Sequence, residues 1–237
     1  MKKVAILQSN YIPWKGYFEI IKEVDEFIIY DDVQYTKNDW RNRNKILSRE
    51  GLQWLTIPVK QKTIHQKINE TEISRFNWNK KHWQSLVTNY AKSPFFEEIS
   101  NVLKPFYESI DSFNLSEINI FFIKKICDIL LIDTKITLCS DYSYDRSLHK
   151  EDRLLSLLNA SNASEYISGP AAKDYMNEDS FIKENIQIHW MTYGPYKRYD
   201  QLHSYNNFEN NVSIIDVLFN VGLKNSYKYI KSIRASL

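Results

Sequence analysis

The sequence predicts an α/β protein with a Rossmann-like, mostly parallel sheet flanked by helices. Short apolar segments with strand character alternate along the chain with amphipathic helical segments, as in sheets whose strands are joined by crossover helices. The first segment, Val4 to Leu7, is an uninterrupted apolar run, which is typical of a strand buried on both faces. With 237 residues the chain can bury a core of its own. We therefore expect one α/β domain over residues 1–237, with a helical insertion at 78–132.

The N-terminal quarter predicts a strand, a loop, a helix and a second strand. Pro13 and Gly16 interrupt regular structure after the first strand. Apolar residues between Tyr17 and Val24 then mark one helical face, and Phe27 to Tyr30 forms the second strand. Asp31 and the residues after it fall at the carboxyl end of that strand, which is where sheets of this kind bind ligands.

The next segments are more polar. Residues 37–50 look too polar for a core and predict a surface segment, and 53–59 predicts a third strand, which Pro58 ends or places at an edge. Residues 60–77 lack a clear period and predict a polar, flexible connection. Three helices then follow between 78 and 132, with Pro94 separating the first from the second.

Alternation of strand and helix returns in the C-terminal half. Strands are predicted at 135–139, 166–168 and 186–190, with a helix around 154–158 between the first two. Ser213-Ile214-Ile215-Asp216 resembles a capping box with Asp in place of the usual Glu, so a helix should begin there and stop near Gly222. A basic helix from Ser226 to about Arg234 is expected to end the chain.

Composition excludes several classes of protein. The 31 basic and 29 acidic residues nearly cancel, which argues against general binding of nucleic acid or membrane surfaces. The two cysteines fit a reducing compartment. No signal segment opens the sequence and no apolar run approaches the roughly 20 residues of a membrane span. We expect a cytoplasmic protein without membrane insertion.

Standard catalytic strings are absent from the sequence. It has no Gly-x-Ser-x-Gly, no phosphate loop and no His-Glu-x-x-His, and its five glycines leave little room for a glycine-rich phosphate cradle. Helix N-termini can still bind phosphate through their free amides. The five histidines form no local pair, so we predict no metal site, and the sequence identifies no cofactor.

A few residues are candidates for chemistry. Asp31 and Asp32 follow a buried strand, where a carboxylate serves as a general base or binds a sugar hydroxyl, although turn or capping roles are as reasonable. His82 is either catalytic or part of a solvated helix face, and His203 in the polar loop 194–211 has the same alternatives. Arg43 or Lys37 suits a carboxylate or phosphate.

The aromatic and basic segment Trp40 to Asn44 has a competing interpretation. Stacking and charge there are also typical of single-stranded nucleic-acid binding, but the near-neutral charge of the whole chain counts against it. We therefore expect no nucleic-acid partner.

Taken together, these segments resemble the WbqC-like protein family. The matching segments are Gln-Ser-Asn-Tyr-Ile-Pro-Trp-Lys-Gly-Tyr-Phe (8–18), Asp-Asp-Val-Gln-Tyr-Thr-Lys (31–37), Trp-Arg-Asn-Arg-Asn-Lys-Ile (40–46), Trp-Leu-Thr-Ile-Pro-Val (54–59), Lys-Lys-His-Trp (80–83), Tyr-Ile-Ser-Gly-Pro-Ala (166–171) and Asn-Val-Ser-Ile-Ile-Asp-Val-Leu-Phe-Asn-Val-Gly (211–222). They cover nearly the whole chain in order. Leu7 and Ser9 depart from the His and Pro that we expect in many members.

The resemblance implies an enzyme of bacterial surface-polysaccharide (O-antigen) biosynthesis. Its partners would be a nucleotide-linked amino sugar and a small acyl or aminoacyl donor, joined as an amide, and a homodimer is compatible with the sequence. Asp31 or His82 would deprotonate the amine, because an ammonium group cannot attack, and Lys15 would hold a phosphate or carboxylate. The substrate-binding candidates are Gln8, Asn10, Tyr11, Trp14, Gln34, Lys37, Trp40, Asn42, Arg43, Asn44, Gly169, Tyr199, Gln201 and His203.

A weaker resemblance concerns the first strand, loop and helix, which look like the opening of the nucleotidyltransferase and pantothenate synthetase superfamily. Those enzymes place a His-x-Gly-His motif on ATP phosphates, and here the matching stretch is Trp14-Lys15-Gly16-Tyr17, which lacks both histidines. The resemblance supports the topology, while the missing histidines argue against adenylylation. The alternative to an enzyme is a non-catalytic protein that binds a sugar nucleotide or assists a glycosyltransferase.

Overall fold

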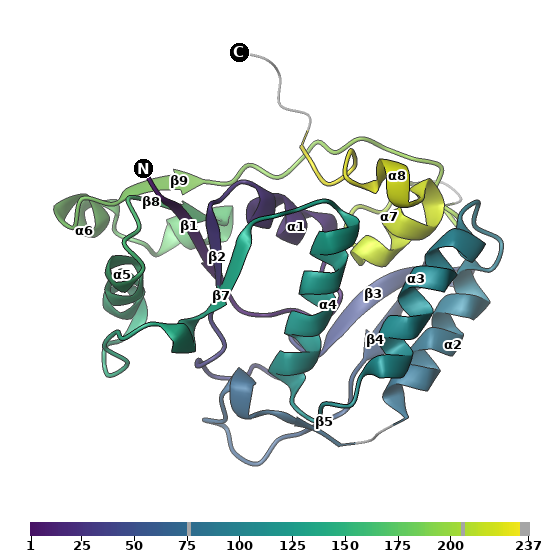
Figure 1. Ribbon diagram of the computed structural model, residues 1–237, viewed down its shortest axis with the longest axis horizontal. Helices are drawn as coiled ribbons and strands as arrows, with labels where there is room; N and C mark the ends of the chain where they lie inside the picture. Colours follow the sequence, from purple (N-terminus) through teal and green to yellow (C-terminus); the bar gives the residue numbers. More distant parts are fainter. Residues whose placement is uncertain (75–76, 205–206, 233–237) are drawn as a thin grey trace.

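The main element of the computed structural model, which describes residues 1–74, 77–204 and 207–232, is a five-stranded parallel sheet (Figure 1). The strand order is β7-β2-β1-β8-β9 and every pairing is parallel. The strands are β1 (Lys3–Leu7), β2 (Glu26–Ile29), β7 (Lys135–Leu138), β8 (Glu165–Ser168) and β9 (Gln187–Trp190). The predicted α/β class is confirmed, and these five strands lie where the sequence predicts them.

The strand order creates a crevice between β1 and β8. From β1 the chain moves outward through β2 to β7, then returns to place β8 on the other side of β1 and continues to β9. The connections from these two central neighbours therefore leave in opposite directions, and the space outside their carboxyl ends stays open.

Helices cover both faces of the sheet. Ala5 and Phe27 point into the larger core, which includes apolar residues of α1 (Lys15–Lys22) and α4 (Leu115–Ile129). Val4 and Ile28 point into the second core, with α5 (Lys150–Ala160) and α6 (Glu178–Lys183). This alternation explains why the strands read as continuous apolar runs, because both of their faces are buried.

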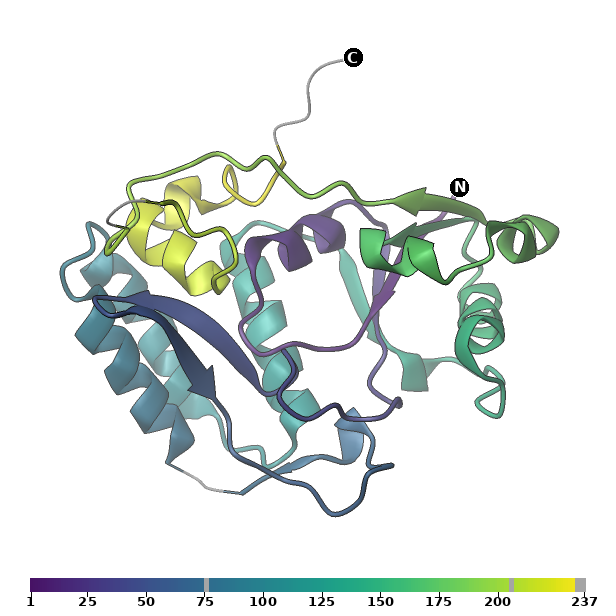
Figure 2. The ribbon, with the colours of Figure 1, turned by 180° about the vertical axis from the view of Figure 1, so that it is seen from behind.

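A hairpin replaces the surface segment expected at residues 37–50. Strands β3 (Arg43–Ser48) and β4 (Gly51–Thr56) pair in antiparallel fashion, and Figure 2 shows them crossing α2 (Trp78–Tyr90) and α3 (Phe96–Ser109). Ile46 is fully buried and Leu47 nearly so, so the expectation was wrong. β4 overlaps the strand predicted at 53–59 and buries Leu55, whereas β3 buries Ile46 and Leu47 within a polar stretch, too few apolar residues to reveal a strand there.

The connection predicted at residues 60–77 also has more structure than expected. β5 (Val59–Lys60) pairs with β6 (Glu72–Ile73), and a short 3-10 helix, η1 (Ile68–Glu70), packs against α4. Ile68 and Ile73 are buried, so these two isolated apolar residues anchor the segment. Residues 75 and 76 lie outside the described part of the chain.

The C-terminal helices differ in part from the prediction. α7 (Ile214–Val221) begins at Ser213 as expected, and α8 (Leu223–Ser226) follows it. The basic helix predicted from Ser226 is wrong as far as residue 232, because turns follow α8 and Ser232 donates its backbone N–H to Glu19 on α1 at 2.8 Å. Residues 233 and 234 lie outside the described residues.

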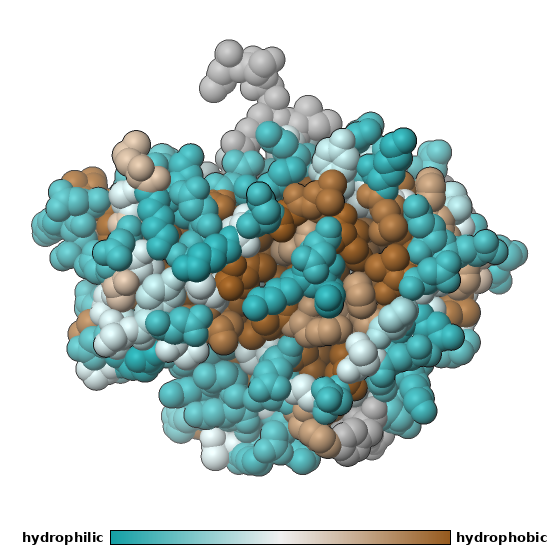
Figure 3. Space-filling model, in the orientation of Figure 1, coloured by the Kyte–Doolittle hydropathy of each residue, from teal (hydrophilic) through white to brown (hydrophobic). Residues whose placement is uncertain are grey.

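Apolar side chains gather in the middle of the face drawn in Figure 3, where α4 and the edge strand β7 lie in Figure 1. Phe121 and Ile129 on α4 and Ile136 on β7 are only partly buried. The free edge of the sheet is thus bordered by apolar surface. Over the three described ranges, no helix combines the length and the apolar character that a membrane crossing requires.

Candidate functional site

A cavity of about 780 Å³ opens at the crevice between β1 and β8, and we call it the switch-point cavity. Leu7 and Gln8 line it from the end of β1, and Ser168 and Gly169 line it from the end of β8. Its volume is that of a small-molecule site, and such sites are usually apolar with a few polar groups. Gln8 and Gly169, both predicted from the sequence, therefore lie at the place expected for the ligand.

The first turn of α5 forms another wall of this cavity, through Lys150 and Glu151. The helix connects β7 to β8, so its N-terminus lies at the carboxyl edge of the sheet, like the cavity. His149, its N-cap residue, makes no capping hydrogen bond with its side chain in the described structure. Glu151 and Asp152 lie in this first turn, where carboxylates interact favourably with the helix N-terminus.

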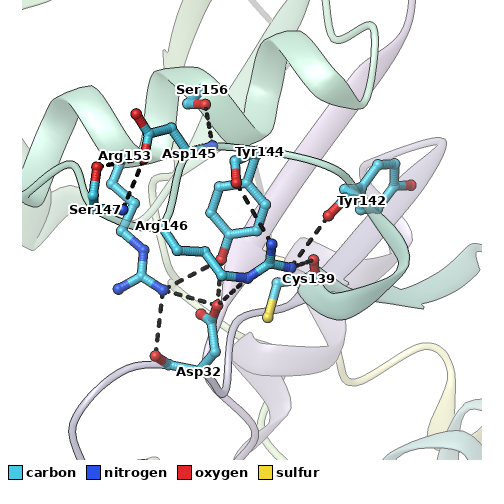
Figure 4. Close-up of polar contacts among 9 residues, drawn as sticks. All are labelled: Asp32, Cys139, Tyr142, Tyr144, Asp145, Arg146, Ser147, Arg153 and Ser156. Carbon is cyan, nitrogen blue, oxygen red and sulfur yellow. Dashed lines mark hydrogen bonds and ion pairs between the residues drawn. The ribbon is translucent and has the colours of Figure 1, made fainter.

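An ion-pair cluster around Asp32 fastens this turn to the end of β2 (Figure 4). Asp32 Oδ2 accepts hydrogen bonds from the Tyr144 hydroxyl at 2.6 Å and from Arg146 Nε at 3.2 Å, and it lies 2.8 Å from Arg153 Nη2. Burial alone raises the pKa of Asp32, but Tyr144 and the two guanidinium groups outweigh it, so the pKa falls below its ordinary value. Asp32 is therefore ionised at neutral pH and holds α5 in place.

Two tyrosines line the cavity with protonated hydroxyls. Burial raises the pKa of Tyr30 to about 12 and raises that of Tyr193 well above its ordinary value. The Arg153 guanidinium lies 5.4 Å from the centre of the Tyr30 ring, which links the Asp32 cluster to the cavity wall. Both hydroxyls can thus donate hydrogen bonds to a ligand at neutral pH.

Sequence reasoning did not name Lys150, Glu151, Tyr30 or Tyr193 as site residues. A helix that starts soon after a parallel strand has its N-terminus at the carboxyl edge of the sheet. The helix predicted near Leu154 was therefore the feature of the sequence that could have pointed to Lys150 and Glu151. The tyrosines could not be distinguished from the other fourteen in the chain.

A second cavity, of about 370 Å³, lies against the loop that follows β1, and we call it the loop cavity. Four predicted substrate-binding residues line it: Asn10, Trp14, Trp40 and Asn44. Although Asn44 lies more than thirty residues from the loop, its Nδ2 donates to the carbonyls of Tyr11 and Ile12 at 3.1 and 2.9 Å. The structure thus brings together the two polar segments that the sequence singled out.

Asp31 lies beneath the same loop. Its carboxylate accepts from the backbone N–H of Ser9 at 2.8 Å and from the hydroxyl of Ser116 on α4. Burial raises the pKa of Asp31 despite these hydrogen bonds. Within the described residues Asp31 is not part of either cavity lining; it ties the loop to α4.

Tyr11 and His82 form a buried hydrogen-bonded pair. The Tyr11 hydroxyl lies 2.9 Å from His82 Nδ1, and His82 Nε2 lies 3.1 Å from the carbonyl of Thr56, which can only accept. Nε2 therefore carries the proton and Nδ1 accepts from Tyr11. Burial lowers the pKa of His82 to about 4, so the ring is neutral at pH 7. Neither residue is among those that line the two cavities in the described structure.

Lys15 is buried at the start of α1. Its Nζ donates to Asn210 Oδ1 at 2.9 Å and lies 4.6 Å from the centre of the Tyr196 ring. Burial lowers the pKa of Lys15 to about 8, with Asp216 acting in the opposite direction. The side chain links α1 to Tyr196 and Asn210.

Asp216 occupies the centre of a buried network that the sequence did not reveal. Its carboxylate accepts from the hydroxyls of Tyr90 at 2.9 Å and Tyr199 at 2.6 Å, and from Gln201 Nε2 at 2.7 Å. Ser213 caps α7 as predicted, whereas Asp216 turns away to these partners and completes no capping box. Tyr199 and Gln201, two predicted binding residues, are thus oriented by Asp216.

A third cavity, of about 720 Å³, is lined by Tyr199, Gln201 and His203 among others. His203 Nε2 lies 2.8 Å from the carbonyl of Asn89 and so donates to it. These three predicted residues therefore lie together, but apart from the residues of the switch-point cavity.

Four other predicted residues are not part of these three linings in the described structure. Gln34 is exposed and donates to the carbonyl of residue 64 at 2.6 Å, and Lys37 is exposed. Asn42 donates to the carbonyl of residue 57 at 2.8 Å, and the Arg43 guanidinium lies 4.1 Å from the centre of the Trp54 ring. For the described residues, no group of three or more His, Cys, Asp or Glu is arranged to hold a metal ion.

Comparison with known proteins gives a consistent result. The sequence model of the WbqC-like protein family matches residues 8–228. The chain is 48% identical over 223 residues to "Uncharacterized protein Rv1507c" of Mycobacterium tuberculosis (strain ATCC 25618 / H37Rv), a match that covers 94% of this chain and 95% of that protein. No solved structure matches the chain.

Proposed function

Since the chain belongs to the WbqC-like protein family, we propose that it acts in bacterial surface-polysaccharide (O-antigen) biosynthesis, transferring an acyl or aminoacyl group to the amine of a nucleotide-linked amino sugar. The observation that carries this proposal is the position of the switch-point cavity at the carboxyl ends of β1 and β8. Nucleotides bind at this position in open parallel sheets.

The lining suits a nucleotide-linked ligand. Tyr175, which is 76% exposed, and Tyr193 offer aromatic surfaces to a base. Lys150 offers positive charge to a diphosphate, beside a first turn of α5 that also carries Glu151 and Asp152. The volume of about 780 Å³ leaves room for more than one ring.

Glu151 is the residue that we assign as general base. Among the described residues of the cavity lining it is the one carboxylate, and its Oε2 is held by the backbone N–H of Asn177 at 2.7 Å. In the proposed step the sugar amine nitrogen bonds to the carbonyl carbon of an activated acyl donor. The bond from that carbon to the leaving group breaks, the leaving group departs with the electron pair, and Glu151 takes the proton that the nitrogen loses.

A second candidate function is ligand binding without turnover. It is favoured by the positions of Asp31, His82 and Lys15, which are buried in hydrogen bonds and, within the described residues, are not part of the switch-point lining. In that case the cavity would present a sugar nucleotide to another enzyme.

Incubation with UDP- and dTDP-linked amino sugars, with acyl thioesters or with amino acids and ATP, tests the proposal when products are followed by mass spectrometry. We expect the sugar nucleotide to gain the mass of the acyl group. Glu151→Gln should lower the rate about a hundredfold or more while leaving affinity for the sugar nucleotide within a few-fold. Glu108→Gln on α3, far along the chain from the cavity lining, is the matched control.

The outcomes separate the candidates. Saturable binding with no mass increase for any donor would select binding without turnover. Absence of binding to every sugar nucleotide would refute both functions. Full activity of the Glu151→Gln variant would refute the assignment of the base.

A further inference from the structure

The loop cavity shares an aromatic pair with the switch-point cavity. Trp14 lines the loop cavity, Tyr193 lines the switch-point cavity, and their rings meet edge to face with centroids 5.2 Å apart. Gln8 likewise lines the switch-point cavity, and Asn10, two residues further on, lines the loop cavity. The two cavities are therefore neighbours across the loop that follows β1.

The frame of the loop cavity is fixed by hydrogen bonds from distant segments. The backbone N–H of Tyr11 donates to the carbonyl of Trp40 at 3.1 Å. The carbonyl of Ile12 accepts from Asn44 Nδ2 at 2.9 Å and from the Ser213 hydroxyl at 2.7 Å. The loop before α1, the β3 strand and the start of α7 are thus joined at one place beside the cavity.

Ile12 has an unusual backbone conformation within this frame. Its φ of 35° lies in the left-handed region, which a β-branched residue rarely adopts. Such strain persists only where surrounding contacts impose it, and it is concentrated at binding and active sites. The hydrogen bonds to the Ile12 carbonyl supply that constraint.

The polar groups of the cavity are mostly donors. The Asn10 side-chain oxygen already accepts from the Arg41 guanidinium, which leaves its NH₂ group for another partner. Lys45 Nζ lies 5.0 Å from the centre of the Trp54 ring and, among the described residues, has no ion pair. No Asp or Glu is present in the described lining. A ligand with a negative charge and hydroxyl groups would satisfy these donors.

The aromatic groups and the volume narrow the ligand further. Trp14 and Trp40 line the cavity, and Trp40 is 39% exposed. Indole faces pack against the flat C–H face of a sugar ring, and their polar edge can still hydrogen-bond. At about 370 Å³ the loop cavity has less than half the volume of the switch-point cavity, which fits one ring and not a nucleotide sugar.

We propose that the loop cavity is a second ligand site, which binds a pyranose that carries a carboxylate. The ring packs on Trp40, the carboxylate pairs with Lys45, and the amides of Asn10 and Asn211 bind hydroxyls. The proposal rests on the loop cavity alone, so it holds or fails independently of any chemistry in the switch-point cavity.

Titration of the intact protein with glucuronate, glucose and acetate, followed by calorimetry, tests the site. We expect glucuronate to bind at least tenfold more tightly than glucose, and acetate to show no saturable binding. Lys45→Met should remove the preference for glucuronate over glucose. Lys22→Met is the matched control. Lys22 Nζ also lies over an aromatic ring, 5.7 Å from the centre of Tyr227, but Lys22 is not part of the described lining of the loop cavity. This variant should bind glucuronate like the wild type.

Asn211→Asp provides a test that does not threaten folding, because residue 211 is exposed. The new negative charge should weaken glucuronate about tenfold and leave glucose within twofold. The proposal is overturned if glucuronate does not saturate, if acetate binds as tightly as glucuronate, or if Lys45→Met and Asn211→Asp both bind glucuronate like the wild type. Both variants should bind sugar nucleotides like the wild type. A loss of glucuronate binding alone therefore reports on the loop cavity and not on the function proposed for the switch-point cavity.

Discussion

Replacement of Glu26 by Gln should destabilise the protein by disconnecting the edge of the sheet. The Glu26 side chain on β2 is 1% exposed and lies 2.6 Å from Lys2 Nζ and 3.1 Å from Lys135 Nζ. It also accepts from the hydroxyls of Thr137 at 2.8 Å and of Tyr142. These contacts join β2 to β7 and to the start of the chain, so the carboxylate is a crosslink within the sheet.

The expected magnitude follows from the pKa. Burial raises the pKa of Glu26, but the hydrogen bonds from Lys2, Tyr142, Thr137 and Lys135 outweigh burial and lower it from 4.5 to about 2. At about 1.4 kcal/mol per pKa unit, this corresponds to about 3 kcal/mol of stability from the ionised form. Lys135 is 67% exposed, and water screens its charge, so we expect about 2 kcal/mol in practice.

The sign of the pH dependence is fixed because the folded pKa is the lower one. The contribution is fully present above pH 4.5 and is lost as the pH falls toward 2. Glu26→Gln imitates the protonated side chain, so the difference from wild type should shrink over the same range.

Urea unfolding of wild type and Glu26→Gln, followed by circular dichroism at pH 7 and at lower pH, measures this difference. At a urea dependence of about 2 kcal/mol per molar, the midpoint should shift by roughly 1 M at pH 7. Glu72→Gln is the control, because Glu72 also pairs with two lysines but is 42% exposed, and its loss should matter much less. A variant within 0.5 kcal/mol of wild type at pH 7, or a deficit that does not change with pH, would refute the reasoning.

Three further predictions concern other parts of the fold. Gly222→Ala should destabilise the protein by about 2 kcal/mol or more in thermal melts, because φ is 73° and the added Cβ would lie 2.5 Å from the Phe95 ring. Gly51→Ala is the control: its φ is also positive, but no atom lies within 4 Å of the added Cβ, so it should cost only about 1 kcal/mol. The His82 ring should show no NMR titration between pH 5.5 and 8, since burial lowers its pKa to about 4. The neutral ring therefore stabilises the folded state above pH 6.5, and this stabilisation should be lost as the pH falls from 6.5 to 4. A titration midpoint near pH 6.5 would contradict the buried pair with Tyr11. Asp32→Ala should release the first turn of α5 and weaken sugar-nucleotide binding about tenfold, and unchanged affinity would show that the cluster does not position the cavity wall.

The parallel sheet was predictable because its signal is local. Each central strand is buried on both faces and therefore reads as a short apolar run, as in Val4 to Leu7. Of the β3–β4 hairpin, β4 overlaps the strand predicted at 53–59, whereas β3 was missed because Ile46 and Leu47 are its buried apolar residues within a polar stretch. Asp216 was misread for a related reason, since its residue type and spacing fit a helix cap while its partners come from two other segments.

The position of the switch-point cavity was also predictable, because parallel sheets leave a crevice at the carboxyl ends of their strands. Most of the residues that line it were not. Asp31 and Asp32 are adjacent and alike in sequence, yet Asp31 holds the loop after β1 and Asp32 holds α5. Glu151 reaches the cavity only through a helix that starts more than a hundred residues after β2. Contacts of such long range leave no periodic pattern in the chain.

The central claim is that a nucleotide-linked amino sugar binds in the switch-point cavity, and obstruction of that cavity tests it most directly. Ala171 lines the cavity and is exposed, so Ala171→Trp should fill the space without disturbing the core. Lys173→Trp, two residues further on and outside the described lining, is the control. Calorimetric titration with UDP- and dTDP-linked amino sugars should show saturable binding to wild type and Lys173→Trp, and at least a tenfold loss in Ala171→Trp. Equal binding to all three proteins, or to none, would contradict the account.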